Sequence, residues 1–192
     1  MKLFSPIYDR VLSWSRHQHA PRYLAALSFS ESSFFPIPPD VMLAPMVLAN
    51  PHRAWNLALL TTVTSVLGGV LGYLIGMFSF ELVEPILRDA GYYPKYLLAK
   101  EWFDEWGFWA VFLAGFSPIP YKVFTITAGV ISMAFLPFVM ASIIGRGARF
   151  FLVAGLLAWG GKGMEETLRK YIDIIGWVTV MLVVILLVVI KW

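Results

Sequence analysis

Five ionisable side chains lie inside apolar stretches of this sequence, where a charge is costly. They are Glu31, Asp40, Lys122, Arg146 and Arg149. On insertion scales each costs about 2.5–3.5 kcal/mol at the centre of a membrane helix, so together they oppose insertion by on the order of 10 kcal/mol unless they meet partners or water. We therefore expect the five side chains to gather in one central cavity, where they leave a formal charge of +1.

The two kinds of charge predict different chemistry. Arg146 and Arg149 are three residues apart and so share a helix face, and the planar fork of arginine matches a phosphate. With Lys122 they are candidates for binding an anionic headgroup. Glu31 and Asp40, carboxylates partly buried near like charge, can take up protons near neutral pH and are proton-coupling candidates. A proton on either carboxylate could then be exchanged for a phosphate at the arginines.

The same residues also have structural explanations. The charges could be ion pairs that hold two halves of the protein in register, and Asp40 could cap the N-terminus of a helix. The sequence has no cysteine, no Ser-His-Asp pattern, no glycine-rich phosphate loop and no HExxH motif, and its histidines lack metal-ligand spacing. We therefore expect no catalytic residue, no metal, no cofactor and no enzymatic activity.

Composition indicates an integral membrane protein. Of the 192 residues, 59% are apolar and only 14% are charged, whereas a soluble domain has about 25% charged residues. The apolar residues are spread over the whole length, so we expect one membrane domain over residues 1–192. The basic residues form no stripe suited to nucleic acid.

A short proline motif occurs twice. The first copy begins at Phe34 and reads FFPIPPDV, and the second begins at Phe116 and reads FSPIPYKV. Prolines remove amide donors and cannot continue a regular helix, so the motifs predict hinges at Pro36, Pro38, Pro39, Pro118 and Pro120. The apolar halves beside each motif are shorter than the roughly 20 residues that cross a bilayer. Each segment is therefore either one kinked spanning helix or a re-entrant hairpin.

The sidedness of positive charge favours two re-entrant hairpins. In that topology eight basic residues share one side with the N-terminus and four lie on the other, which puts the N-terminus in the cytoplasm. The hairpins then enter from opposite sides, bring Asp40 and Lys122 together at the middle of the membrane, and are each followed by a spanning helix. The predicted fold is an all-α integral membrane protein with an inverted repeat, the usual architecture of secondary transporters.

The expected division of the chain follows from this topology. Residues 1–22 predict an interfacial amphipathic helix, 23–80 the first repeat, 81–106 a polar interfacial linker with a turn near Gly91, 107–161 the second repeat, and 162–192 a C-terminal transmembrane helix. Within 54–80, small residues recur every fourth position from Thr64 to Gly76. Such a stripe predicts close packing of another helix.

The motifs together resemble the DedA family, also called the SNARE-associated or VTT-domain family. The resemblance rests on Glu31-x4-Pro36-x-Pro38-Pro39-Asp40, followed by Gly115-Phe116-x-Pro118-x-Pro120-x-Lys122 and Ala128-Gly129. It covers roughly residues 27–161 and is closest to the small bacterial YqaA branch.

This resemblance implies opposed re-entrant hairpins. Some bacterial members translocate undecaprenyl phosphate with the proton motive force, and eukaryotic relatives scramble phospholipids. The acidic residues of the family's first hairpin match Glu31 and Asp40. Its second hairpin often carries two arginines, in a pattern like GRFxPxxR, which fall here on Gly115 and Tyr121. We infer that Arg146 and Arg149 supply the missing charge.

The expected function is transport in the bacterial inner membrane, as a multi-pass protein. The favoured interpretation is a proton-coupled flippase for an anionic membrane lipid, either a polyprenyl phosphate such as undecaprenyl phosphate or a phospholipid. The alternatives are a proton- or cation-coupled exporter of small solutes for membrane homeostasis, and a non-transporting membrane scaffold. The sequence leaves the oligomeric state open, with a homo-oligomer as one alternative.

Overall fold

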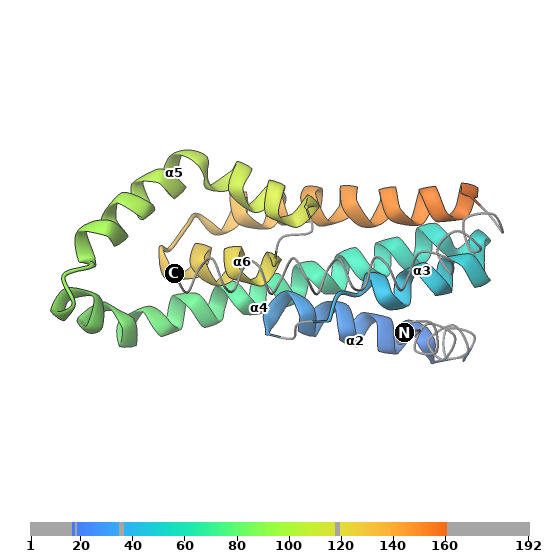
Figure 1. Cartoon of the computed structure of the whole chain (residues 1–192), viewed down its shortest axis with the longest axis horizontal. Helices are drawn as coiled ribbons and strands as arrows, with labels where there is room; N and C mark the ends of the chain where they lie inside the picture. Colours follow the sequence, from blue (N-terminus) through green and yellow to red (C-terminus); the bar gives the residue numbers. More distant parts are fainter. Residues whose placement is uncertain (1–16, 18, 35–36, 118–119, 161–192) are drawn as a thin grey trace, which may run out of the picture.

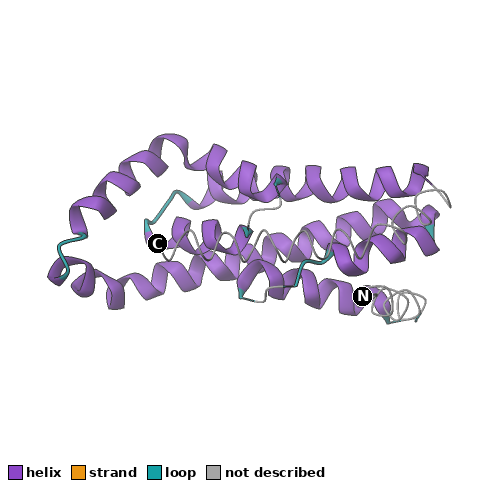
Figure 2. Ribbon diagram, viewed as in Figure 1, coloured by secondary structure: helices purple, strands orange, loops and turns teal. Residues whose placement is uncertain are grey.

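The computed structural model describes residues 17, 19–34, 37–117 and 120–160. These residues form helices and no strand (Figure 2). In chain order the elements are α2 (Ala20–Ser33), α3 (Asp40–Ala49), the short 3-10 helix η1 (Pro51–Arg53), α4 (Ala54–Asp89), α5 (Tyr93–Phe116), α6 (Tyr121–Val130) and a helix over Phe135–Gly160, called here the 135–160 helix. Most of the predicted helix 1–22, the predicted helix 162–192, Pro36 and Pro118 lie outside the described residues.

Two pairs of helices turn near the middle of the molecule. In Figure 1, α2 runs toward the middle and α3 returns toward the end from which α2 came. From the opposite end, α5 and α6 do the same. The long helix α4 runs between the two pairs, and the 135–160 helix follows the second pair. The predicted helix breaks therefore fall at both proline motifs, where α2 ends at Ser33 and α5 ends at Phe116.

The start of α3 differs from the expectation in one detail. Asp40 was expected as a candidate N-cap, but the residue at that position is Pro39, and no side chain caps the helix. Asp40 is instead the first residue of α3, and its carboxylate binds an arginine of the 135–160 helix. The capping prediction is wrong because that charged partner takes the carboxylate away from the backbone amides.

Helix α4 is longer than the predicted span over 54–80. It has 36 residues, which at 1.5 Å per residue is about 54 Å, well beyond the hydrocarbon thickness of a bilayer. The polar region 81–106 is thus the end of α4, a turn, and the beginning of α5. The turn contains Gly91 with φ +72°, a backbone conformation that glycine adopts without steric cost.

The stripe of small residues on α4 packs against two other helices. A Cβ atom on Gly68 would overlap the carbonyl oxygen of Phe29 in α2, and one on Gly76 would overlap that of Ile126 in α6. Gly72 lies between them, with the side chain of Thr125 close by. The stripe therefore lets one helix from each hairpin approach the α4 backbone, as the spacing predicted.

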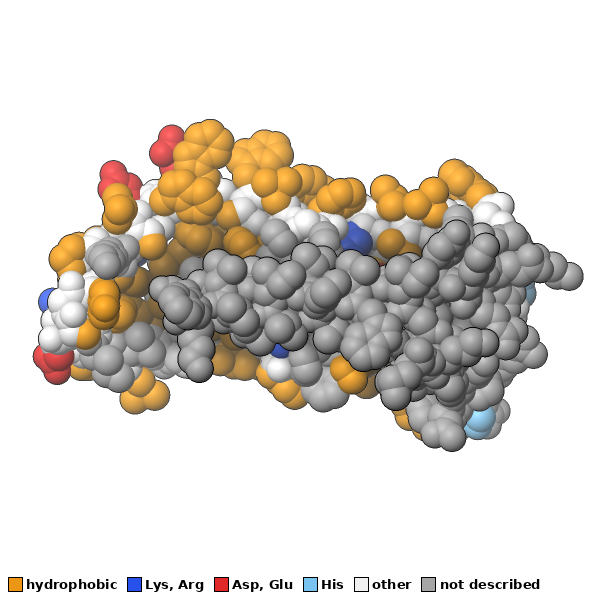
Figure 3. Space-filling model, viewed as in Figure 1, with side chains coloured by type: hydrophobic (Ala, Val, Ile, Leu, Met, Phe, Trp, Pro, Cys, Tyr) orange, Lys and Arg blue, Asp and Glu red, His pale blue; other side chains and the backbone are white. Residues whose placement is uncertain are grey.

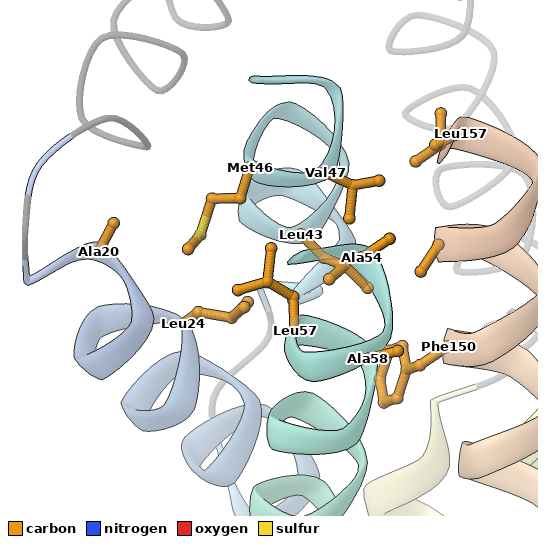
Figure 4. Close-up of a cluster of buried hydrophobic side chains, with 11 residues drawn as sticks. Ala20, Leu24, Leu43, Met46, Val47, Ala54, Leu57, Ala58, Phe150 and Leu157 are labelled. Atoms are coloured by element: carbon orange, nitrogen blue, oxygen red, sulfur yellow. The ribbon is translucent and has the colours of Figure 1, made fainter. Parts of the chain in front are cut away.

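The buried apolar side chains form two clusters, one on each side of the middle. One joins α2, α3, α4 and the 135–160 helix, with Leu24, Leu57 and Phe150 among its members (Figure 4). The other joins α4, α5, α6 and the 135–160 helix around Tyr73 and Phe138. The buried polar side chains, among them Ser32, Ser65 and Arg146, belong to neither cluster.

The outer surface is strongly apolar. On the face shown in Figure 3, hydrophobic side chains line the 135–160 helix, while acidic ones lie along α5 and near the turn between α4 and α5. Within the described part of the chain, two helices are long and apolar enough to cross a membrane, Pro51–Leu82 and Phe135–Gly160. Their exposed members include Leu59, Leu67, Leu136, Met140 and Leu156, a surface suited to hydrocarbon.

Candidate functional site

Arg146 lies at the centre of the structure in a pair with Glu31, called here the buried pair. Its Nη2 donates to Glu31 Oε2 at 2.6 Å, and its Nε donates to Ser65 Oγ at 2.5 Å. The side chain of Arg146 is only 2% exposed and that of Glu31 14%. Burying an arginine to this degree is tolerable only with a paired charge and further hydrogen bonds.

Hydroxyl groups complete the surroundings of the buried pair. Ser32 Oγ lies 3.1 Å from Glu31 Oε2 and 2.7 Å from Ser65 Oγ. On the other side, the Arg146 guanidinium lies 4.9 Å from the ring centroid of Tyr121 and 4.7 Å from that of Phe150. Aromatic faces stabilise a desolvated cation. The charge is thus enclosed by polar groups and rings from several helices.

Tyr121 is itself held in place. It opens α6 and is fully buried, and its hydroxyl donates to Ser142 Oγ at 2.5 Å. Ser142 in turn donates to the carbonyl of Phe138, at 2.7 Å. The ring beneath Arg146 is therefore fixed to the same helix that carries the arginine.

Arg149 lies one turn further along and forms what we call the open pair with Asp40. Its Nη2 donates to Asp40 Oδ2 at 2.7 Å, and its Nη1 donates to the Ser117 carbonyl oxygen at 2.8 Å. The side chains are 19% and 26% exposed, respectively. Asp40 follows the first proline turn and Ser117 begins the second, so this one guanidinium connects the two turns.

Two polar atoms beside Arg149 lack a hydrogen-bond partner. Among the described residues, Asp40 Oδ1 and Ser117 Oγ are buried and unpaired. An unpaired buried polar atom costs about 1–3 kcal/mol, so such atoms call for an explanation. Both belong to residues that Arg149 binds, and the open pair is therefore incompletely satisfied.

The structure brings four of the five predicted charges together in two pairs. Lys122, in the first turn of α6, is half-buried, and it forms no ion pair within residues 17, 19–34, 37–117 and 120–160. The expected meeting of Asp40 with Lys122 is replaced by the contact of Asp40 with Arg149. The second turn instead contributes the carbonyl group of Ser117.

The hydroxyl groups were not predicted as part of the site. Ser32 and Ser65 contact each other across α2 and α4, and Ser28 Oγ donates to the Thr61 carbonyl at 2.8 Å one turn away. The signal was present in the sequence as small hydroxyl residues four apart in two apolar stretches, a pattern that joins helices in lipid. In the part of the chain that is described, no group of His, Cys, Asp or Glu side chains could hold a metal ion.

Comparison with known proteins decides the family. The family model for the VTT domain matches residues 37–158, a segment that contains Asp40, the second turn and Arg149. The chain belongs to the VTT-domain family, the DedA family of the resemblance above. An uncharacterised protein of Haemophilus influenzae is 51% identical over 185 residues, covering 96% of each chain. One of Histophilus somni is 46% identical over 191 residues, covering 100% of each.

A more distant VTT-domain relative has a named activity. Undecaprenyl phosphate transporter A of Staphylococcus aureus is 29% identical over 118 residues, which cover 57% of this chain and 58% of that protein. No solved structure matches the chain. Family membership and the two candidate spanning helices of the described residues together indicate a bacterial membrane protein.

Proposed function

We propose that this VTT-domain protein is a transporter that moves a lipid with an anionic phosphate headgroup across the bacterial inner membrane. The observation that carries the proposal is Arg149, a partly exposed guanidinium that joins the two proline turns through Asp40 and Ser117. The headgroup is that of undecaprenyl phosphate or of a phospholipid. The lipid undergoes no chemical conversion.

The membrane topology that we propose has two re-entrant hairpins. Helices α3 and α6 have 10 residues each, half of what a crossing needs, and each returns toward the end from which its partner helix came (Figure 1). The two hairpins then enter from opposite sides, α4 and the 135–160 helix cross, and the N-terminus is cytoplasmic. Such an inverted repeat supports alternating access around a site at its centre.

The charges support an anion as cargo and protons as the coupling ion. The buried pair and the open pair are each neutral in sum, so half-buried Lys122 leaves a positive excess near the second turn. A phosphate suits both this excess and the fork of Arg149. Glu31 and Asp40 are the carboxylates that would carry protons. The name of the Staphylococcus relative, an undecaprenyl phosphate transporter, agrees with a polyprenyl phosphate cargo.

The test is reconstitution of the purified protein into liposomes with a fluorescent polyprenyl phosphate, with and without a pH gradient. We expect headgroup movement that the gradient accelerates, and recovery of unchanged lipid. Asp40→Asn and Glu31→Gln should each remove the dependence of transport on the pH gradient. If Glu31→Gln does not fold, the result for Asp40→Asn is decisive. Absence of headgroup movement under every gradient would contradict the proposal. Movement of a small solute in place of the lipid would favour an exporter. If neither the lipid nor a solute moved, a non-transporting scaffold would be favoured.

A further inference from the structure

The two arginines of the site differ in how far a ligand can reach them. The side chain of Arg146 is 2% exposed and that of Arg149 19%. The partners of Arg146 come from α2 and α4, and the ring centroids of Tyr121 and Phe150 lie 4.9 and 4.7 Å from its guanidinium. Among the described residues, the partners of Arg149 are Asp40 at the start of α3 and Ser117 at the second turn. A headgroup therefore has access to one of the two cations.

We propose that the phosphate headgroup binds Arg149 by displacing the Asp40 carboxylate, and that it does not displace Glu31 from Arg146. This assignment rests on the proposed function and divides its residues into two roles. Arg149 is the headgroup-binding residue, and Asp40 is the internal competitor that occupies it in the empty state. Arg146 is a positioning residue that holds α2, α4 and the 135–160 helix together.

Asp40 uses only part of what an arginine offers. It accepts one hydrogen bond, from Nη2, through Oδ2, while Nη1 is turned to the Ser117 carbonyl. The bidentate geometry that makes an arginine–carboxylate pair strong is therefore not used. A phosphate has enough oxygens to accept from both Nη1 and Nη2, which makes it a stronger ligand here than the carboxylate.

The unpaired atoms beside Arg149 support the same assignment. Ser117 Oγ is buried and has no partner among the described residues, although a hydroxyl can donate to a phosphate oxygen. Asp40 Oδ1 is unpaired as well, so the carboxylate loses one hydrogen bond when it leaves. In the empty state the site thus contains an unused donor and an incompletely bound competitor.

Displacement at the buried pair would cost far more. Glu31 Oε2 accepts from both Arg146 Nη2 and Ser32 Oγ, and the arginine is also bonded to Ser65. Removing Glu31 from the pair would leave a charge in a place with almost no water, which costs several kcal/mol. The open pair is therefore the one that exchanges.

The experiment measures binding of farnesyl phosphate to the full chain in detergent micelles by titration calorimetry at one fixed pH. Farnesol and inorganic phosphate are separate arms. We expect farnesyl phosphate to bind, with farnesol and inorganic phosphate at least tenfold weaker. Equal affinity for farnesol would exclude recognition of the phosphate, and equal affinity for inorganic phosphate would exclude a lipid ligand. Either result would overturn the assignment.

Three variants test the competition directly. Arg149→Gln should weaken farnesyl phosphate binding by roughly tenfold or more, the effect of one charge-assisted hydrogen bond. Asp40→Asn should strengthen it by a similar factor, because the competitor loses its charge. The double variant should bind as weakly as Arg149→Gln alone. A gain in affinity cannot come from misfolding, so Asp40→Asn keeps the test decisive if Arg149→Gln is unstable.

Matched controls carry the same chemical changes at exposed positions. Arg53→Gln and Asp89→Asn, both far from the turns in sequence and solvent-exposed, should leave the affinity within twofold. If the wild type binds but Asp40→Asn binds no more tightly, this assignment is wrong and the proposed function stands. If the wild type neither binds nor moves the lipid, both are wrong.

Discussion

Arg146 and Arg149 are three residues apart on one helix, and each binds one carboxylate, yet their surroundings differ. The neighbour of Arg146, Gly145, has no side chain, and a Cβ there would lie 2.5 Å from the carbonyl oxygen of Phe112 in α5. Helices close in tightly around Arg146 and exclude solvent. Arg149 lies instead between two turns, and its side chain is 19% exposed. The comparison shows that the helix contacts around an arginine, more than its own charge, decide whether it is structural or available to a ligand.

The largest expected effect comes from breaking the buried pair. Glu31→Gln leaves Arg146 charged and 2% exposed, so we expect a loss of about 3–5 kcal/mol in the free energy of unfolding. Chemical unfolding in detergent, followed by circular dichroism, measures it. The control is Glu84→Gln, which breaks the exposed pair with Arg88 and should cost about 0–1 kcal/mol. Equal losses for the two variants would mean that the burial of Arg146 has no energetic weight.

Removing a hydroxyl partner of Arg146 should have a smaller effect. In Ser65→Ala the arginine Nε loses its acceptor, which should cost about 1–3 kcal/mol in the same unfolding measurement. Thr64→Ala is the matched control, since Thr64 bonds only to carbonyls of its own helix. A larger loss for Thr64→Ala would show that the serine is not part of the buried network.

The aromatic support of the buried pair can be separated from its hydrogen bond. Tyr121→Phe keeps the ring beneath Arg146 and removes the bond to Ser142, so we expect a loss of about 0.5–1.5 kcal/mol in unfolding free energy. Tyr23→Phe, at a position 58% exposed, should change nothing measurable. If Tyr121→Phe destabilised the protein as much as Glu31→Gln, the hydroxyl rather than the ring would be the main support.

The smallest effect on stability is expected at the open pair. In Asp40→Asn the contact with Arg149 loses its charge, but the amide oxygen can still accept from Arg149, whose bond to the Ser117 carbonyl remains. We therefore expect a change in unfolding free energy of about 1 kcal/mol or less, the effect of one ordinary hydrogen bond. A loss above about 3 kcal/mol would place Asp40 beside Glu31 as a structural residue and remove the distinction between the pairs.

Much of the fold could be predicted from residue chemistry alone. Helix breaks follow wherever several prolines remove amide donors, and the glycine stripe of α4 required a close helix neighbour. The gathering of Glu31, Asp40 and the two arginines followed from the cost of a lone charge in an apolar span. Each of these inferences follows from the residues of one segment and does not require knowing which other segments pack against it.

The pairing of the charges could not be predicted in the same way. Glu31 and Arg146 are 115 residues apart, and their contact depends on the depth and rotation of α2 and the 135–160 helix. A rotation of one residue would have presented Arg146 to lipid. The full length of α4 was hidden for a different reason. The last turns of α4 contain Pro85, are polar and carry the exposed Glu84–Arg88 pair. In sequence they therefore resemble a surface linker.

The contact between α4 and α6 limits how the second hairpin can move. Gly76 meets the carbonyl of Ile126, and Gly129 meets that of Tyr73, so each backbone lies against the other. At these two glycines no side chain separates the backbones, so this part of the contact has nothing that could repack during a slide along the helix axes. We therefore expect α6 to move relative to α4 by rotating about the contact at Gly76 and Gly129, and not by sliding along it.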